Sequence, residues 1–218
     1  MTTSPPYDPT DVNSLVEALR SAGLVGWEAR RDVVRALTNM GSAVIDAMLT
    51  ALHDDYVVVR WSAAEVLAEL GVMHAEPELT NGLVQALKDN HRAVRIAAAE
   101  GLGYIDVEHV IPPLMQTLQD HEAHVRWTAI RSLLAHHAYG NRALPDLVPL
   151  LIDILQDDDE AVRELAADAL GDLGDERAVD ALIAGMHDHD ADVQVASMRA
   201  LQRIGTPPAL DAVDNHSD

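Results

Sequence analysis

Large apolar side chains recur at one position of a repeated helical pattern. Trp61, Ile96 and Trp127 each directly follow an Arg, and on a helix this position faces away from the predicted core. A helical stack does not require large apolar groups there, whereas aromatic anchors with charged neighbours are typical of protein-binding sites. The sequence therefore predicts a partner-binding surface formed by Trp61, Glu65, Glu69, Ile96, Glu100, Tyr104, Trp127, Arg131 and Leu134.

A second interpretation is that these Trp side chains fold over adjacent helices and only shield the stack. Packed helices lie about 8–10 Å apart, so Trp61 and Trp127, two repeats apart, should be separated by about 20 Å. Ile96 would fill the gap between them and complete an apolar strip. Replacing a shielding Trp would lower stability, whereas replacing an anchor would weaken partner binding.

Histidines near the predicted turns raise the possibility of a metal site. Residues 121–124 read HEAH, and His and Glu are metal ligands, but both are also ordinary solvated turn residues. The GLGY segment at 101–104 lacks the strand that a phosphate loop requires, and its glycines are expected to admit a close neighbour or a ligand. No Ser sits in a nucleophile pattern. We therefore expect no catalytic residue, no metal and no cofactor, and an enzymatic role is the weaker interpretation.

A repeat of about 33 residues positions these side chains. The copies share an apolar residue followed by Arg, then two residues, a pair of small residues, and Leu and usually Gly, with Gln in place of Arg in the last copy. This length fits a two-helix unit with short turns. The anchors of the six copies are Arg30, Arg60, Arg95, Arg126, Arg163 and Gln194.

The apolar positions within each copy indicate a helix with one buried face. Counted from the anchor, positions −1, +3, +7 and +10 are almost always apolar, which is the spacing of one helix face. In the second copy these positions are Val59, Ala63, Leu67 and Leu70. Three glycines stand where such a helix is expected to end: Gly71, Gly174 and Gly205.

An Asp lies six residues before the anchor in every copy from the second onward. The pairs are Asp54 with Arg60, Asp89 with Arg95, Asp120 with Arg126, and Asp157 with Arg163. Each Asp either caps the following helix or meets the Arg, and the repetition predicts a ladder of charge-assisted hydrogen bonds. Both ends break the pattern. Leu24 stands at the Asp position of the first copy, and Gln194 stands in place of the Arg six residues after Asp188.

Composition restricts the classes of partner. The formal net charge is −21, which disfavours nucleic acid and favours a protein or peptide of basic character. The chain has no Cys, and no apolar run approaches the length of a membrane span. We expect no membrane partner and a cytoplasmic location.

The segments VVRWSAAEVLAELG, AVRIAAAEGLGYID and AVRELAADALGDLG resemble HEAT-like repeats of the phycobilisome (bilin) lyase type. The resemblance extends over roughly residues 10–205 and implies an α-solenoid whose second helices line the concave face. Lyases of this type attach or remove a bilin on phycobiliproteins, and many other proteins with this repeat are adaptors. The sequence contains no lyase-specific motif.

These observations predict an all-α fold, an α-solenoid of about six two-helix HEAT-like repeats over residues 10–205. Residues 1–9 are expected to be a disordered segment and residues 206–218 a flexible tail, with Thr10 or Asp11 capping the first helix. The predicted function is a scaffold or adaptor that binds a partner on its concave face. The alternatives are a bilin-lyase-like chromophore-handling subunit and a metal-dependent enzyme.

Overall fold

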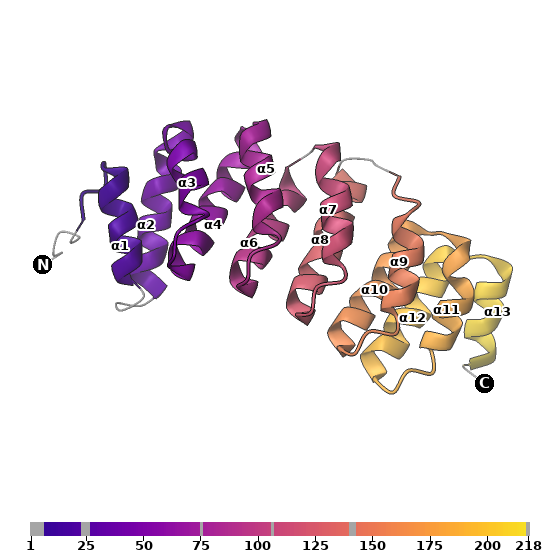
Figure 1. The fold of residues 1–218 in the computed structure, drawn as a ribbon. Coiled ribbons are helices and arrows are strands. Elements are labelled where there is room, and N and C mark those ends of the chain that lie inside the picture. The colour runs from indigo at the N-terminus through magenta and orange to yellow at the C-terminus, as the bar shows by residue number, and fades with distance from the viewer. Residues whose placement is uncertain (1–6, 23–26, 75, 106, 140–142, 217–218) are drawn as a thin grey trace, which may run out of the picture. The chain divides into compact units, whose positions relative to one another are not determined.

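The computed structural model describes residues 7–22, 27–74, 76–105, 107–139 and 143–216, and every regular element in these ranges is helical. The chain divides into two compact units, Met1–Thr117 and Leu118–Asp218, which are described separately below. The described helices follow one another along the chain, two for each predicted repeat, with one further helix at the end (Figure 1). The predicted all-α fold of two-helix repeats is therefore confirmed.

The first unit contains seven α-helices, counted over its described residues. They are α1 (Val12–Ala22), α2 (Trp27–Asn39), α3 (Ile45–Ala51), α4 (Val57–Met73), α5 (Pro77–Ala86), α6 (Arg92–Tyr104) and α7 (Ile111–Thr117). Two short 3₁₀ segments precede α3 and α7, at Gly41–Val44 and Glu108–Val110. Asp11 caps α1, since its carboxylate accepts from the backbone N–H groups of Asn13 and Ser14, as the sequence predicts.

The second unit contains six α-helices in its described residues. They are α8 (Ala123–Tyr139), α9 (Leu147–Ile154), α10 (Glu160–Leu173), α11 (Val179–Gly185), α12 (Ala191–Ile204) and α13 (Pro207–His216), with a 3₁₀ segment at Glu176–Ala178 before α11. The expectation of a flexible tail after Gly205 is wrong for residues 207–216. Ala209 and Val213 lie one helical turn apart and are buried, so α13 closes the end of the apolar core.

The predicted core positions are buried. Val59, Ala63, Leu67 and Leu70 have no exposed surface, so the −1, +3, +7, +10 face of α4 is the inner face. Gly174 and Gly205 end α10 and α12 with φ of 66° and 68°, a conformation that favours glycine.

Gly71 does not end its helix, which contradicts the prediction. The helix α4 continues to Met73, and Gly71 is buried within it. A Cβ atom at this position would lie 2.4 Å from Ile105 Cδ1, so the glycine is required by close packing rather than by a turn.

The repeated Asp and Arg residues connect successive repeats, but the carboxylate partner differs from the predicted one. Arg60 Nη1 donates to the backbone carbonyl of Asp54, six residues earlier, at 2.9 Å. Its Nε and Nη2 donate to the carboxylate of Asp89 in the next repeat, at 2.7 and 3.1 Å. Arg60 therefore joins the turn of its own repeat to the turn that follows.

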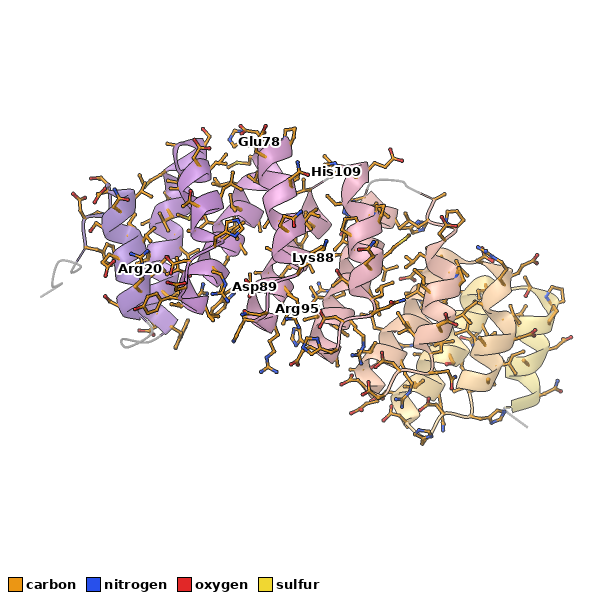
Figure 2. All side chains as sticks on the ribbon, viewed as in Figure 1. Arg20, Glu78, Lys88, Asp89, Arg95 and His109 are labelled. Atoms are coloured by element: carbon orange, nitrogen blue, oxygen red, sulfur yellow. The ribbon has the colours of Figure 1, made fainter. Side chains whose placement is uncertain are left out.

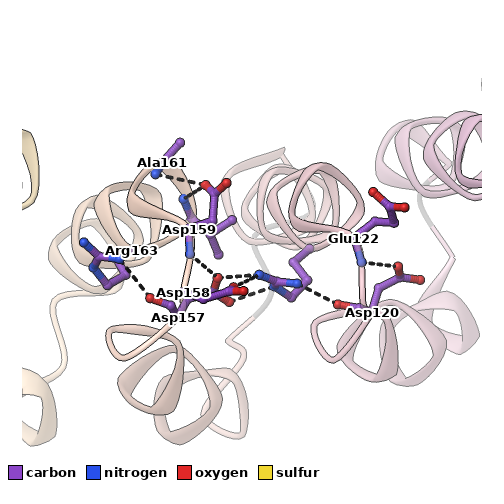
Figure 3. Close-up of polar contacts among 9 residues, drawn as sticks. Asp120, Glu122, Asp157, Asp158, Asp159, Ala161 and Arg163 are labelled. Atoms are coloured by element: carbon purple, nitrogen blue, oxygen red, sulfur yellow. Dashed lines mark hydrogen bonds and ion pairs between the residues drawn. The ribbon is translucent and has the colours of Figure 1, made fainter.

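The second unit repeats this arrangement (Figure 3). Arg126 donates to the carbonyl of Asp120 at 2.9 Å and to the carboxylates of Asp157 and Asp158. Arg163 donates to the carbonyl of Asp157 and, through two nitrogens at 2.9 Å each, to the carboxylate of Asp188. Paired N–H donors on one carboxylate hold these helix starts in a fixed register.

The same Asp carboxylates also shape the turns. Asp54, Asp89, Asp120, Asp157 and Asp188 each accept a hydrogen bond from the backbone N–H two residues later. The residue two positions after the Asp then caps the next helix where its side chain is suitable, as Asp159 does for α10 and Asp190 for α12. The predicted capping of the following helix by the repeated Asp is therefore wrong, because the residue two positions later takes that role. Pairing with an Arg is found for Asp89, Asp157 and Asp188, in each case with the Arg of the preceding repeat.

The ends of the ladder use different residues. Asp54 receives its cation from Arg20 at the end of α1, with Nη2 to Oδ2 of 2.6 Å. Figure 2 labels Arg20 in the first unit, together with Asp89 at the turn before α6 and Arg95 in α6, which donates to the carbonyl of Asp89. Gln194 keeps the carbonyl contact, through Nε2 to Asp188 O at 2.6 Å. Leu24 lies outside the described residues.

Ion pairs with Arg help to lower the pKa of two carboxylates in the ladder, Asp89 and Asp188. Burial opposes ionisation of Asp89 and is the largest single effect, but hydrogen bonds from Arg60 and from the His91 backbone together outweigh it and lower the pKa. Asp188 behaves in the same way: burial opposes its ionisation, and Arg163 and the Asp190 backbone lower its pKa. The carboxylates of Asp89 and Asp188 therefore remain charged at neutral pH.

Candidate protein-binding groove

A groove of about 440 Å³ runs between α4 and α6 in the first unit. Its walls are the outward faces of the two helices, at the positions that the sequence analysis identified. The lining residues are Trp61, Glu65, Ala68, Glu69 and Val72 from α4, and Ile96, Ala97, Glu100, Gly101 and Tyr104 from α6. Six of the nine predicted binding residues line this single groove.

Close helix approach forms the floor. A Cβ atom at Gly101 would lie 2.2 Å from Ala68 Cβ and 2.9 Å from its Cα, so α6 comes this close to α4 because position 101 has no side chain. The expectation that the GLGY glycines admit a close neighbour is confirmed for Gly101. The adjoining pair of Arg60 and Asp89 fixes the starts of the same two helices.

The Trp61 side chain is not fully available to a partner, because an Arg of the same chain already contacts its ring. The guanidinium carbon of Arg30, on α2, lies 3.6 Å from the centroid of the Trp61 ring, and Arg30 Nη1 donates to Glu65 Oε2 at 2.6 Å. Arg30 is the anchor of the first repeat, yet its side chain stacks on Trp61 instead of joining the ladder. Trp61 is half-buried and contributes both to helix packing and to the groove lining. Its contact with Arg30 supports the shielding interpretation, and partner binding by this side chain stays a prediction.

The other end of the groove is open and acidic. Tyr104 and Val72 are 57% and 59% exposed. The carboxylates of Glu69 and Glu100 lie on opposite walls and, within the described part of the chain, neither has a cationic partner. An exposed apolar surface beside two unpaired carboxylates is suited to a segment that carries both apolar and basic side chains.

The remaining three predicted residues belong to the second unit. Trp127, Arg131 and Leu134 lie on α8, where the Arg131 guanidinium carbon is 4.8 Å from the Trp127 ring centroid. The Trp127 ring also contacts that of His124, with centroids 5.9 Å apart. Because the two units are treated separately, a continuous strip from Trp61 to Trp127 stays a prediction.

The helices α10 and α12 carry polar residues at the positions that form the groove in α4 and α6. Arg203 donates to Asp168 at 2.5 Å and contacts Asp172, and Arg199 donates to Asp168 at 3.3 Å. These ion pairs bridge the two helices. The corresponding surface in the second unit is therefore occupied by pairs of opposite charge.

Sequence reasoning missed four groove residues: Ala68, Val72, Ala97 and Gly101. Ala68 stands at offset +8, which the helical pattern already marks as outward. Ala97 and Gly101 stand at offsets +2 and +6 and reach the groove because small side chains expose the floor. A stripe of small residues beside the outward positions is the signal that could have identified them.

Two further properties concern metals and membranes. In residues 7–22, 27–74, 76–105, 107–139 and 143–216, no group of three or more His, Asp or Glu side chains is arranged to hold a metal ion. The segment HEAH contributes to no such group. Within the same ranges, no helix combines the length and the apolar character needed to cross a bilayer.

Comparisons with known proteins extend these observations. Residues 80–153 and 148–217 match the family model of HEAT repeats. A search of curated protein sequences gave no match. Among solved structures, the Escherichia coli protein YibA superposes with a TM-score of 0.68 at 21% identity, over 94% of this chain and 76% of that one.

Two other structures are informative. The complex of CpcE and CpcF of phycocyanin lyase from Nostoc sp. PCC7120 is 25% identical, with a TM-score of 0.60 over 73% of this chain and 99% of that one. A designed armadillo repeat protein in complex with the peptide (KR)4 is 17% identical, with a TM-score of 0.61 over 90% of this chain and 100% of that one. The family match covers more than half of the sequence, and the chain therefore belongs to the HEAT repeat proteins.

Proposed function

We propose that this protein is an adaptor that binds an exposed segment of another protein in the groove between α4 and α6. The observation that carries the proposal is the open end of the groove, where Tyr104 and Val72 are exposed beside the unpaired carboxylates of Glu69 and Glu100. Contiguous exposed apolar surface of this kind commonly marks an interaction site. The HEAT repeat fold is typical of protein-interaction scaffolds.

Charge complementarity determines the kind of partner. The groove rim is acidic, and the chain as a whole has a net charge of −21, which attracts basic segments over long distances. The designed armadillo protein of similar fold is described in complex with a peptide of Lys and Arg. The proposed partner segment therefore carries basic side chains toward Glu69 and Glu100 and apolar side chains toward Ile96 and Ala97.

The experiment is a selection of peptides from a random display library, followed by titration of the selected peptide. Ile96→Ser should weaken binding about tenfold, the usual consequence of removing an apolar contact at an interface centre. Val195→Ser is the matched control, because Val195 holds the same repeat position on α12 and is 46% exposed. Circular dichroism confirms that both variants are folded.

Three outcomes would contradict the proposal. The first is the absence of any selected peptide that prefers the wild type over Ile96→Ser. The second is an equal loss of affinity in both variants, which would indicate a general effect rather than binding in the groove. The third is selection of peptides without basic residues, which would remove the role of Glu69 and Glu100.

A chromophore-handling function is the second candidate, supported by the similarity to the phycocyanin lyase complex. In this case the apolar groove would hold a bilin rather than a peptide. Adding the protein to a free bilin should then change the visible absorbance and induce circular dichroism in the bilin bands. An unchanged bilin spectrum at saturating protein concentration would exclude this candidate.

A further inference from the structure

Every Trp in the protein is stacked against an Arg of the same chain. The guanidinium carbons of Arg31, Arg30 and Arg131 lie 4.9, 3.6 and 4.8 Å from the ring centroids of Trp27, Trp61 and Trp127 respectively. In the first and third cases the Arg follows the Trp by four residues on one helix. In the second case the Arg comes from a different helix.

The contact of Arg30 with α4 shows which side chains of a helix can bind an Arg that comes from another segment. Trp61 and Glu65 are four residues apart on α4, a spacing that brings two side chains together on the helix surface. The guanidinium carbon of Arg30 lies over the ring of Trp61, and Glu65 accepts a hydrogen bond from Nη1 at 2.6 Å. An aromatic ring and a carboxylate with this spacing thus form a receptor for a guanidinium.

The helix α6 carries a second ring and carboxylate at this spacing, with the carboxylate before the ring in the chain instead of after it. Glu100 and Tyr104 are also four residues apart, and both line the groove. Tyr104 is 57% exposed, and no Arg of the described residues lies over its ring or pairs with Glu100. Glu69, on the opposite wall of the groove, supplies another unpaired carboxylate.

We propose that Glu100 and Tyr104 form a receptor for an Arg side chain of the partner, an inference that rests on the proposed function of the groove. The guanidinium stacks on the Tyr104 ring and donates hydrogen bonds to Glu100 and Glu69. An Arg is preferred over a Lys, because a planar guanidinium both stacks on a ring and presents several N–H donors, whereas an ammonium is a compact point charge. Tyr104 therefore determines specificity, while Ile96 and Ala97 accommodate apolar neighbours of the Arg.

The test compares blocked peptides in which Leu alternates with Arg, Lys or citrulline. Titration at about 0.15 M NaCl limits non-specific attraction to the acidic surface. The wild type should bind the Arg peptide about fivefold more tightly than the Lys peptide, and the uncharged citrulline peptide most weakly. Tyr104→Leu should reduce the ratio of Arg to Lys affinity to about one, because stacking is lost while the carboxylates remain.

Matched variants separate this receptor from general electrostatics. Glu100→Gln should weaken binding of the Arg peptide. Glu78→Gln removes the same charge from the first turn of α5 and should leave binding unchanged. Figure 2 labels Glu78 at a distance from the turn that contains Asp89. Tyr139→Leu, at a Tyr that is 88% exposed outside the groove, is the control for Tyr104→Leu.

The outcomes distinguish this inference from the proposed function. Equal affinity for the Arg and Lys peptides, or a ratio that survives Tyr104→Leu, would overturn the Arg receptor and leave the groove as a binding site. Failure of all three peptides to bind would overturn the receptor and would also contradict a groove for basic segments.

Discussion

The helix pairs α4/α6 and α10/α12 share one backbone arrangement but present different surfaces. In the first pair Gly101 lies against Ala68, and in the second Gly171 lies against Ala200, where a Cβ atom would be 2.7 Å from the Ala200 Cα. In each pair the contact joins the residue at offset +8 of the first helix to the residue at offset +6 of the second. These residues are Ala68 and Gly101 in the first pair, and Gly171 and Ala200 in the second. The close approach of the helices is therefore a property of the repeat.

Side chains at offsets +5 and +9 account for the difference. In α12 these positions hold Arg199 and Arg203, which pair with Asp168 and Asp172 of α10. In α6 the corresponding residues are Glu100 and Tyr104, which leave the groove open. The fold is compatible with either surface, so the exposed apolar groove is not a requirement of stability. An exposed apolar groove that stability does not require supports the proposal that it binds a partner.

The largest expected effect comes from the ladder, which both regions share. Arg163→Met should reduce the free energy of unfolding by about 3 kcal/mol, because it leaves the largely buried carboxylate of Asp188 without its cation. Denaturant titration measures this loss. Arg199→Ala, which removes an exposed cation from the same unit, should cost less than about 1 kcal/mol. Similar losses in the two variants would contradict the importance assigned to the ladder.

The second prediction concerns the helix approach common to both pairs. Gly101→Ala should destabilise the protein by about 2 kcal/mol, since the new methyl group would overlap Ala68. Adding Ala68→Gly reproduces the arrangement of α10 and α12 and should restore most of the lost stability. Denaturant titrations of the single and double variants test this. A double variant as unstable as the sum of its parts would show that the two helix pairs are not equivalent.

The third prediction converts one surface into the other. The double variant Glu100→Arg and Tyr104→Arg places the side chains of α12 on α6, facing Glu65 and Glu69. Stability should change by less than about 1 kcal/mol, because only exposed pairs are added. Binding of the selected peptide should fall at least tenfold, about 1.4 kcal/mol. Retained binding, measured by calorimetry, would place the partner elsewhere.

The smallest expected effect is a change in pH dependence. The pKa of Asp188 is lower in the folded than in the unfolded protein, so its contribution is present above the unfolded pKa of about 3.9 and is lost as pH falls through the folded value. Asp188→Asn should reduce stability at pH 7 and show a shallower decline below about pH 4. Asp211→Asn on α13, an exposed site, provides the control. Identical acid profiles for the wild type and Asp188→Asn would contradict a role for this carboxylate.

Much of the architecture follows from local spacing. Offsets within a helix predicted that Val59 and Leu67 are inside and that Ile96 and Tyr104 are outside, because 3.6 residues per turn fixes the face of each side chain. The constant interval between Asp89 and Arg95 predicted a repeated contact at the turns. These features depend on neighbours along the chain, which the sequence displays directly.

Partners from other repeats were harder to predict. Arg60 was expected to meet Asp54, but its carboxylate partner is Asp89, because the side chain is long enough to reach the following turn. Arg30 was expected to resemble the other anchors, yet it stacks on Trp61. Spacing fixes the face on which a residue lies, but the choice among several carboxylates and rings on that face depends on the packing of whole helices.

The most direct test of a partner-binding groove uses the absence of Cys from the natural sequence. Val72→Cys places a single thiol at the open end of the groove, and Val195→Cys places one at an exposed position on α12. We predict that the display-selected peptide slows modification by a thiol reagent at position 72 at least tenfold at saturation, whereas the rate at position 195 stays unchanged. Equal rates at position 72 with and without peptide would contradict binding in the groove.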